Sequence, residues 1–534
     1  MLPLTSRPSL LAIGLTLAWC IGASAQAPNV EDLPTRSTID KPEGGHPARA
    51  LPLEPLPAPR SWPPEASPRA EEPTPPPLEL EHVLAAVERS YPLLAAVERD
   101  RVIAAGKLES SIGKFFDTKV TTLYGQEILG FYRNERFDAS IEQNTGLRGA
   151  KLEAGYKLGL GSFIDADGNM QTNDGGEFRA GMAVPMLRDG SIDRRRANIA
   201  QAELGRAAAE PKIYKQRLNF IKGAAKVYWT WVGTGQKYMV AQSLLNVAME
   251  RDRQLRIRVE KGDIAEIEQI DNLRVVYQRQ AKVTESQREF QRAAILLSLF
   301  VRNDAGLPAL PPADRLPPGF PQPPAIDPAR VDEDIRVALV RRPELQVLEF
   351  ERRKLRVELE YARNQCLPAL DLAMKGSQDI GGQDPKRNKG PFELEAGVLF
   401  QAPLQRRDAR GQIRAAQAEI DQITAELRYA QDSVVADVQD AMSALLAARD
   451  RAEQSRQGAI VARQVEQLER KKFELGNSTL LIVNLREQAT FDARVLELEA
   501  LSEFYKAIAE YRAALAWDAD PIGTPPTPPR APKE

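Results

Sequence analysis

Lys471-Lys472-Phe473-Glu474-Leu475-Gly476-Asn477-Ser478-Thr479-Leu480-Leu481 is the segment from which the fold of this chain can be worked out. Residues suited to helices stand on both sides of its glycine. Because glycine adopts positive φ without strain, Gly476 is expected to end one helix and let the chain reverse. Arg258-Val259-Glu260-Lys261-Gly262 resembles this segment at an offset of 214 residues, so Gly262 is expected to form an equivalent turn.

Other pairs of similar segments occur at comparable offsets. They are Ser90-Tyr91-Pro92 with Arg341-Arg342-Pro343, residues 178–185 with 394–403, and Asn272-Leu273-Arg274 with Asn484-Leu485-Arg486. A fixed offset between similar segments indicates an internal repeat. The chain is therefore predicted to contain two copies of one unit, each running helix, strands, long helix, turn and return helix.

Proline is confined to a few places. Of its 40 prolines, 15 lie in 28–77, nine in 308–328 and six in 521–532, whereas 212–307 and 404–520 contain none. Proline-rich segments favour extended chain, and long proline-free segments permit long helices. The predicted divisions are a signal peptide (1–25), a disordered N-terminal arm (26–79), a first repeat (80–302), a linker (303–330), a second repeat (331–517) and a C-terminal tail (518–534).

Alternation of apolar and polar residues predicts strands in both copies. The alternating runs are 118–123, 150–158 and 178–184 in copy one, and 370–374 and 392–398 in copy two. One apolar and one polar face fits a barrel wall, although a half-exposed soluble sheet has the same pattern. Pro185 and Pro403 follow the last strand of each copy and are assigned as strand-to-helix junctions.

The spacing of Pro185 from Gly262 and of Pro403 from Gly476 predicts two very long helices. At 1.5 Å per residue each could extend about 100 Å. Two shorter segments, before and after the linker, would together match one long helix.

A seven-residue repeat within residues 413–441 favours a coiled-coil seam over an ordinary amphipathic helix. The seam residues are Ile413, Ala416, Ile420, Ile423, Leu427, Ala430, Val434 and Ala441. Pro211 is expected to kink the first long helix.

The composition excludes several function classes. The 72 basic and 74 acidic residues nearly balance, which argues against a nucleic-acid-binding protein. The only histidines are His46 and His82, so histidine-based catalytic and zinc sites are not expected. No metal site, cofactor or catalytic residue is predicted. The abundant acids are interpreted as solvated helix faces.

The N-terminus has the features of a cleavable export signal. Leu10–Leu17 form a short apolar core, and Ala23-Ser24-Ala25 supplies small residues for cleavage before Gln26. Lipidation at Cys20 is the alternative, but the preceding Trp19 is too bulky for a lipobox. No later apolar run reaches the 18 residues of a transmembrane helix.

The duplicated unit, Pro185, Pro403 and the segment around Gly476 resemble the TolC-like outer-membrane efflux and export channel family over residues 80–517. The resemblance implies a mainly helical fold with strands. Four strands from each chain of a homotrimer would close a twelve-stranded transmembrane β-barrel, and the coiled-coil helices would form a periplasmic α-barrel. The implied partners are a periplasmic adaptor (membrane fusion) protein, an inner-membrane RND or ABC pump and outer-membrane lipid. The implied function is a passive exit duct for efflux or type I secretion, not an enzyme.

Copy one has 33 more residues than copy two between its matching prolines. Because the flanking helices must lie on one side of the membrane, the number of crossings must be even. The three strand-like runs of copy one therefore cannot all cross, and one is expected in an enlarged external loop that includes residues 165–169.

The resemblance also implies that Gly262 and Gly476 lie at the periplasmic tip. Some family members carry acidic rings six and nine residues beyond the second turn, where this chain has Ile482 and Leu485. An apolar constriction from these two residues, with Glu268 and Asp271 beside it, is one hypothesis. Packing of Ile482 and Leu485 between helices is the other.

A periplasmic coiled-coil structural or adhesion protein is the alternative function. It would share the seam and the tails. The position of the strands at the same point of each repeat favours the channel. The sequence does not identify the cargo or the type of pump.

Overall fold

The computed structural model describes residues 76–163, 171–303, 306–382 and 392–517. The chain divides into two units, 1–64 and 65–534, and all described residues lie in the second. The predicted signal peptide, the C-terminal tail and the loop 165–169 lie outside the described residues.

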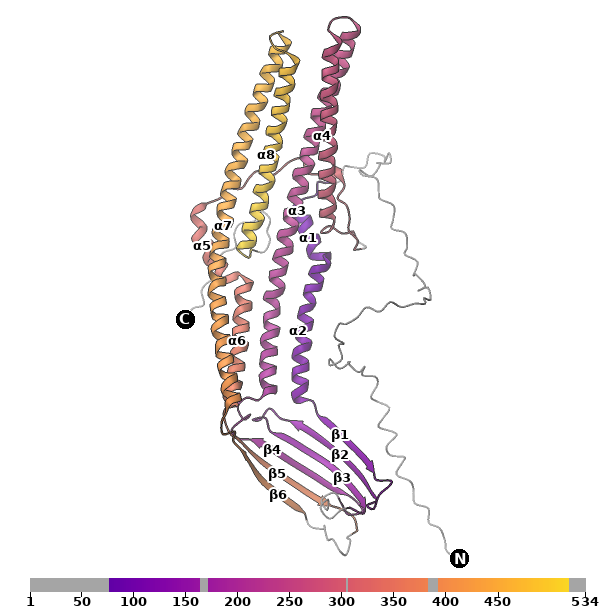
Figure 1. The fold of residues 1–534 in the computed structure, drawn as a ribbon, viewed down its shortest axis with the longest axis vertical. Coiled ribbons are helices and arrows are strands. Elements are labelled where there is room, and N and C mark those ends of the chain that lie inside the picture. The colour runs from indigo at the N-terminus through magenta and orange to yellow at the C-terminus, as the bar shows by residue number, and fades with distance from the viewer. Residues whose placement is uncertain (1–75, 164–170, 304–305, 383–391, 518–534) are drawn as a thin grey trace, which may run out of the picture. The chain divides into compact units, whose positions relative to one another are not determined.

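The helices and strands repeat in the same order twice (Figure 1). Copy one contains α1 (Leu80–Ser90), α2 (Pro92–Phe116), β1 (Lys119–Gln126), β2 (Asn134–Asn144), β3 (Lys151–Gly161), β4 (Glu177–Pro185), α3 (Arg194–Glu260) and α4 (Glu266–Ser298). Copy two contains α5 (Val331–Arg341), α6 (Pro343–Asn364), β5 (Ala369–Asp379), β6 (Glu393–Gln401), α7 (Arg407–Glu474) and α8 (Leu480–Ala514). Between them lie the 3₁₀ turns η3 (Ala313–Arg315) and η4 (Pro328–Arg330). The predicted duplication is confirmed.

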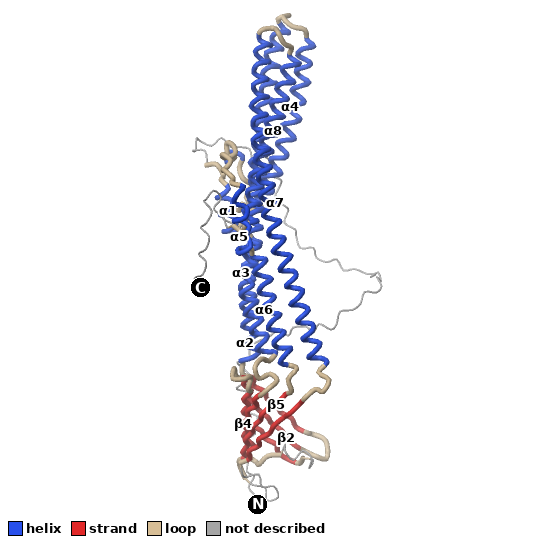
Figure 2. Tube along the Cα trace, turned by 90° about the vertical axis from the view of Figure 1, so that its left-hand side faces the viewer, coloured by secondary structure: helices blue, strands red, loops and turns tan. Residues whose placement is uncertain are grey.

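Two long helices organise the bundle. α3 has 67 residues and α7 has 68, so each is about 100 Å long. α2 and α4 pack along different parts of α3, and α6 and α8 do the same along α7 (Figures 1 and 2). The sequence predicts that the segments before and after the linker together match one long helix, whereas in the structure each long helix is accompanied by two shorter helices of its own copy. α3 continues through the buried Pro211 without a break in its helical assignment.

The predicted seam of α7 explains this packing. Ala416 and Val434 are 3% and 1% exposed, and the other seam residues are half-buried. Val434 and Val438 pack in a core cluster with residues of α5, α6 and α8. Small and branched side chains at a seven-residue spacing let these helices approach closely.

The linker between the copies is packed against the helices. Phe320 packs beside the stacked rings of Trp229 and Tyr505, which are 4.3 Å apart, at centroid distances of 5.8 and 5.7 Å from them. Gln236 of α3 donates a hydrogen bond to the carbonyl of Pro317 at 2.6 Å. Leu78, just before α1, is 5% exposed, and its backbone N–H donates to the carbonyl of Arg315 at 2.8 Å. The last residues of the predicted N-terminal arm are therefore held against the linker.

All six strands form one antiparallel sheet in the order β1-β2-β3-β4-β5-β6 (Figure 1). The expectation that one run of copy one lies in an external loop is wrong, because all three runs are strands of this sheet. The even number comes instead from β2, which the sequence reasoning missed. Its apolar residues Phe137, Ala139 and Ile141 do alternate with Arg136, Asp138 and other polar residues. The described residues contain six strands, where the resemblance implied four per chain.

Among the described residues, none of the helices has both the length and the hydropathy needed to cross a membrane.

Candidate functional site

The sheet has one apolar face that spans all six strands. The register places Val120 beside Ile141, Ile141 beside Ala154, and so on across the sheet. The residues of this face are Val120, Thr122, Tyr124, Phe137, Ala139, Ile141, Leu152, Ala154, Tyr156, Leu158, Phe178, Ala180, Met182, Val184, Leu370, Leu372, Met374, Leu394, Ala396, Val398 and Phe400. Period-two alternation puts them all on one side.

Much of this apolar face is not covered by the chain itself. Val120 of β1 is 68% exposed, Phe178 of β4 is 55% exposed, and Val398 and Phe400 of β6 are 66% and 64% exposed. An uninterrupted apolar surface of this kind is typical of a surface that meets lipid or another protein.

The opposite face of the sheet is charged. Arg179 of β4 lies 2.8 Å from Asp138 of β2 and 3.5 Å from Glu153 of β3. Lys157 of β3 lies 2.6 Å from Glu177 of β4. Opposite charges side by side across strands stabilise this face and keep it hydrated. The sheet therefore separates an apolar surface from a polar one.

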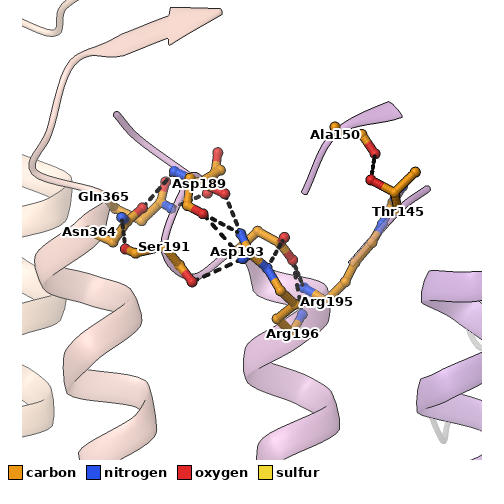
Figure 3. A network of polar contacts seen from close by, with 10 residues as sticks. Thr145, Ala150, Asp189, Ser191, Asp193, Arg195, Arg196, Asn364 and Gln365 are labelled. Atoms are coloured by element: carbon orange, nitrogen blue, oxygen red, sulfur yellow. Dashed lines mark hydrogen bonds and ion pairs between the residues drawn. The ribbon is translucent and has the colours of Figure 1, made fainter. Parts of the chain in front are cut away.

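A polar network joins the β4–α3 connection to the start of α3 and to the end of α6 (Figure 3). Asp193 caps α3 by accepting hydrogen bonds from the backbone N–H groups of Arg195 and Arg196 at 2.8 and 2.9 Å. Asn364 at the end of α6 accepts from the N–H of Asp189 at 2.7 Å and donates to Ser191 at 2.9 Å. The connection from β4 to α3 is thus tied to the second copy.

The predicted junction residues Pro185 and Pro403 lie where the chain leaves β4 for α3 and β6 for α7. Pro185 is the last residue of β4 and pairs with Asp371 of β5. Pro403 follows β6 by two residues and precedes α7 by four. Pro185 is at the end of β4 and Pro403 lies beyond the end of β6, positions near strand ends that tolerate the missing N–H of proline.

The predicted turn glycines have the same conformation in both copies. Gly262 and Gly476 each have φ of +77° and follow α3 and α7. The N–H of Asp263 donates to the carbonyl of Arg258 at 2.9 Å, and the N–H of Asn477 donates to that of Lys472 at 2.9 Å. This 6→1 bond with glycine in the left-handed region is a Schellman ending, which explains why each helix stops there.

The candidate constriction residues begin the return helices. On α8, Ile482 is 37% exposed and Leu485 is 60% exposed, so the chain's own core does not enclose them. On α4, Glu268 is exposed, and Asp271 accepts hydrogen bonds from Arg274 at 2.9 and 3.0 Å. Leu485 and Arg274 line the same groove between α4 and α8. The structure thus brings Leu485 toward the Asp271–Arg274 pair.

A buried charged network beyond these residues joins all four helices of this end. The carboxylate of Glu487 on α8 accepts hydrogen bonds from Arg279 of α4 at 2.8 Å, from Arg470 of α7 at 3.0 Å, and from Arg251 of α3. Glu487 is 2% exposed and Arg279 is 4% exposed. Arg251 also donates to Asn484 at 2.5 Å.

Burial raises the pKa of Glu487, but the hydrogen bonds and charges of Arg251 and Arg279 outweigh it, so its pKa lies below the usual range. The sequence reasoning missed this network. One signal was available, because Glu487 stands at the i+4 position between Val483 and Phe491, which are both buried. A charged residue within an apolar stripe requires a partner.

No group of three or more histidine, cysteine, aspartate or glutamate side chains in the described ranges is arranged to hold a metal ion.

A family model and several solved structures are similar to this chain. Residues 335–516 match the family model described as outer membrane efflux protein. No curated protein sequence matches the chain.

Several solved structures share the fold. The MtrE outer membrane channel of Neisseria gonorrhoeae, in its open state, has a TM-score of 0.60 at 14% identity, with 82% of this chain and 89% of that chain covered. The CmeC outer membrane channel of Campylobacter jejuni has a TM-score of 0.58 at 13% identity, covering 82% and 85%. The outer membrane protein VceC of Vibrio cholerae has a TM-score of 0.57 at 15% identity, covering 82% and 96%. The chain therefore has the fold of the TolC-like outer-membrane channels, and its second repeat matches the outer membrane efflux protein family.

Proposed function

We propose that this chain is the outer-membrane exit duct of a tripartite efflux or type I secretion system. The observation that carries the proposal is the six-stranded sheet, which has one apolar face and one charged face and stands at one end of helices about 100 Å long. A lipid-facing wall with a polar interior requires this alternation. The helices give the duct its reach into the periplasm.

A homotrimer follows from what one chain leaves incomplete. Within the described part of the chain, β1 pairs only with β2 and β6 only with β5, so both edges of the sheet present unpaired backbone groups there. Unpaired edges are not tolerated in hydrocarbon, and closure into a barrel removes them. Three copies related by rotation would pair each β6 with the next β1 and close the ring.

The partners follow from the same placement. The end that carries Gly262 and Gly476 would meet a periplasmic adaptor protein and an inner-membrane RND or ABC pump. The pump supplies the energy and selects the cargo, and the duct conducts passively without a chemical reaction. Outer-membrane lipid covers the apolar face.

The N-terminal segment 1–25 serves as a cleaved signal peptide, with Cys20 not lipidated.

At that same end Ile482 and Leu485 form the narrowest point of the closed duct, with Glu268 and Asp271 beside them. Support comes from the exposure of both apolar side chains at the start of α8. Side chains that a single chain leaves exposed next to its tip are available to meet their copies around a threefold axis.

The test is reconstitution of the purified full-length protein into planar lipid bilayers. We expect detergent-dependent trimers that produce discrete ion-conducting steps. A protein that stays soluble and trimeric without detergent, and gives no conductance, would identify the periplasmic coiled-coil alternative instead. The exposed apolar face of the sheet weighs against that alternative, because a soluble protein seldom leaves so large a surface uncovered.

A further inference from the structure

The strands are shared unequally between the two copies. Copy two contributes one hairpin, β5–β6, whereas copy one contributes two, β1–β2 and β3–β4. One hairpin per copy would be enough to carry the chain into a membrane and back. β1–β2 is therefore an insertion, and it accounts for most of the 33 additional residues of copy one.

The apolar face continues without a break from this inserted hairpin into the rest of the sheet. The ring of Tyr156 on β3 lies 6.3 Å from Phe137 of β2 and 5.0 Å from Phe178 of β4. Aromatic rings at these distances pack favourably across strands. The apolar sides of β1 to β4 therefore face the same environment.

The charged face is equally continuous. Arg179 of β4 reaches across β3 to Asp138 of β2, at 2.8 Å, with the two side chains only 17% and 30% exposed. The inserted hairpin is therefore tied to β4 by an ion pair on one face and by the aromatic row on the other. It is part of the sheet and not an appendage to it.

The loop at the far end of the hairpin is apolar and uncovered. Ile128, Leu129 and Phe131 are 75%, 88% and 91% exposed, and the ring of Phe131 packs against Tyr132 at 5.1 Å. In water such a loop would favour aggregation. Aromatic and apolar residues at strand ends are typical of the boundary between membrane and water.

We infer that β1 and β2 cross the membrane together with the other four strands, so that three chains close a barrel of eighteen strands. The inference rests on the proposed function. The partner of β1 is β6 of a second copy, because the edges of an antiparallel six-stranded sheet run in opposite directions and can pair antiparallel. The lengths match, with eight residues in β1 and nine in β6.

The size of the exit follows from the strand number. Barrel diameter grows roughly linearly with the number of strands, so eighteen strands give a diameter about 1.5 times, and a cross-section about twice, that of twelve. The outer opening would then admit bulkier cargo than one hairpin per copy allows.

Spin labels measure this diameter directly. A strand spacing of about 4.8 Å and a tilt of about 40° place equivalent Cα atoms of three chains about 21 Å apart around twelve strands and about 31 Å apart around eighteen. Val398, which is 66% exposed on β6, would be replaced by cysteine in a full-length chain whose Cys20 and Cys366 are serine. We expect the larger distance, plus the length of the labels, from pulsed electron paramagnetic resonance in lipid.

A deletion supplies the matched comparison. Residues 118–146 can be removed with little rearrangement, because Gln143 donates a hydrogen bond to the carbonyl of Phe116 at 2.6 Å and the two ends lie side by side. The deletion should shorten the measured distance by about one third. A full-length chain that already gives the shorter distance, unchanged by the deletion, would overturn the inference but leave a trimeric duct.

A second measurement does not depend on the deletion. A label at Val120, which is 68% exposed on β1, should collide with dissolved oxygen and not with a water-soluble nickel complex, as a label at Val398 should. Accessibility to nickel at Val120 alone would contradict the inference. Accessibility to nickel at both positions, with no defined distance between copies, would instead contradict the proposed function.

Discussion

Replacement of Glu487 by glutamine should weaken the connection between the α3–α4 and α7–α8 hairpins. The substitution keeps the shape of the side chain and one hydrogen-bond acceptor, but it removes the charge that faces Arg251, Arg279 and Arg470. Arg279 is 4% exposed, so its charge would be left without a carboxylate in a buried site. Leaving one partner of a buried pair uncompensated costs about 3 to 5 kcal/mol.

The lower end of that range is expected here. The amide oxygen of glutamine can still accept one hydrogen bond, and Arg470 is 44% exposed, so water partly replaces its lost partner. We therefore expect a loss of about 3 kcal/mol, which corresponds to about a 100-fold change in the equilibrium for local opening.

Native-state amide hydrogen exchange of the full-length protein measures this opening locally. Exchange of the protected amides around Arg251 and Glu487 should accelerate by about 100-fold, while amides of α2 and α6, at the other end of the bundle, should be unaffected. Glu285→Gln is the matched control. It removes the same charge from an ion pair with Lys282 that is 45% and 56% exposed, where a loss of less than about 1 kcal/mol is expected.

The pH dependence gives an independent check. Because the pKa of Glu487 is lowered in the folded protein, its contribution is fully present above the unfolded value of about 4.3 and is lost as the pH falls through the folded pKa. The difference between the parent protein and Glu487→Gln should shrink below about pH 4. Equal exchange rates for Glu487→Gln and Glu285→Gln at neutral pH would refute the reasoning.

Three further predictions address the turn, the constriction and the linker. Gly476→Ala should destabilise the α7–α8 turn by about 1 kcal/mol. The cost comes from its φ of +77° alone, because the added Cβ would meet no atom within 4 Å. Gly476→Asn should cost less, and equal thermal stabilities of the two variants would contradict this. Replacing both Ile482 and Leu485 with serine should raise single-channel conductance if they narrow the duct, and unchanged conductance would reject the constriction. Phe320→Leu should lower the free energy of unfolding by about 1 to 2 kcal/mol, because it removes the ring that packs against both Trp229 and Tyr505. Urea titration followed by tryptophan fluorescence would measure this, and a loss below about 0.5 kcal/mol would show that this contact contributes little.

The features predicted correctly from the sequence are those that depend on nearby residues. A glycine within each long proline-free stretch, followed by a second helical segment, predicts a left-handed helix ending, and both Gly262 and Gly476 have it. A seven-residue spacing predicts the buried seam of α7, and Ala416 and Val434 lie in it. Because the unit occurs twice, each copy supports the interpretation of the other.

The strand count was misjudged for a physical reason. Alternation in 134–144 is visible in the sequence, but its many charged residues resemble a loop until a neighbouring strand places Arg179 beside Asp138. Parity correctly required an even number of strands in copy one. It could not say whether two or four satisfied the requirement, because strand pairing is a contact between distant residues.

The sequence by itself determined the duplication, the two long helices and their turns. Periodicity and backbone preference act over a few residues, so they can be read along the chain. Only the tertiary structure decided that six strands share one sheet and that Glu487 holds arginines from three other helices. Such contacts join residues up to 236 positions apart, and no local pattern specifies which of many arginines a buried carboxylate will meet.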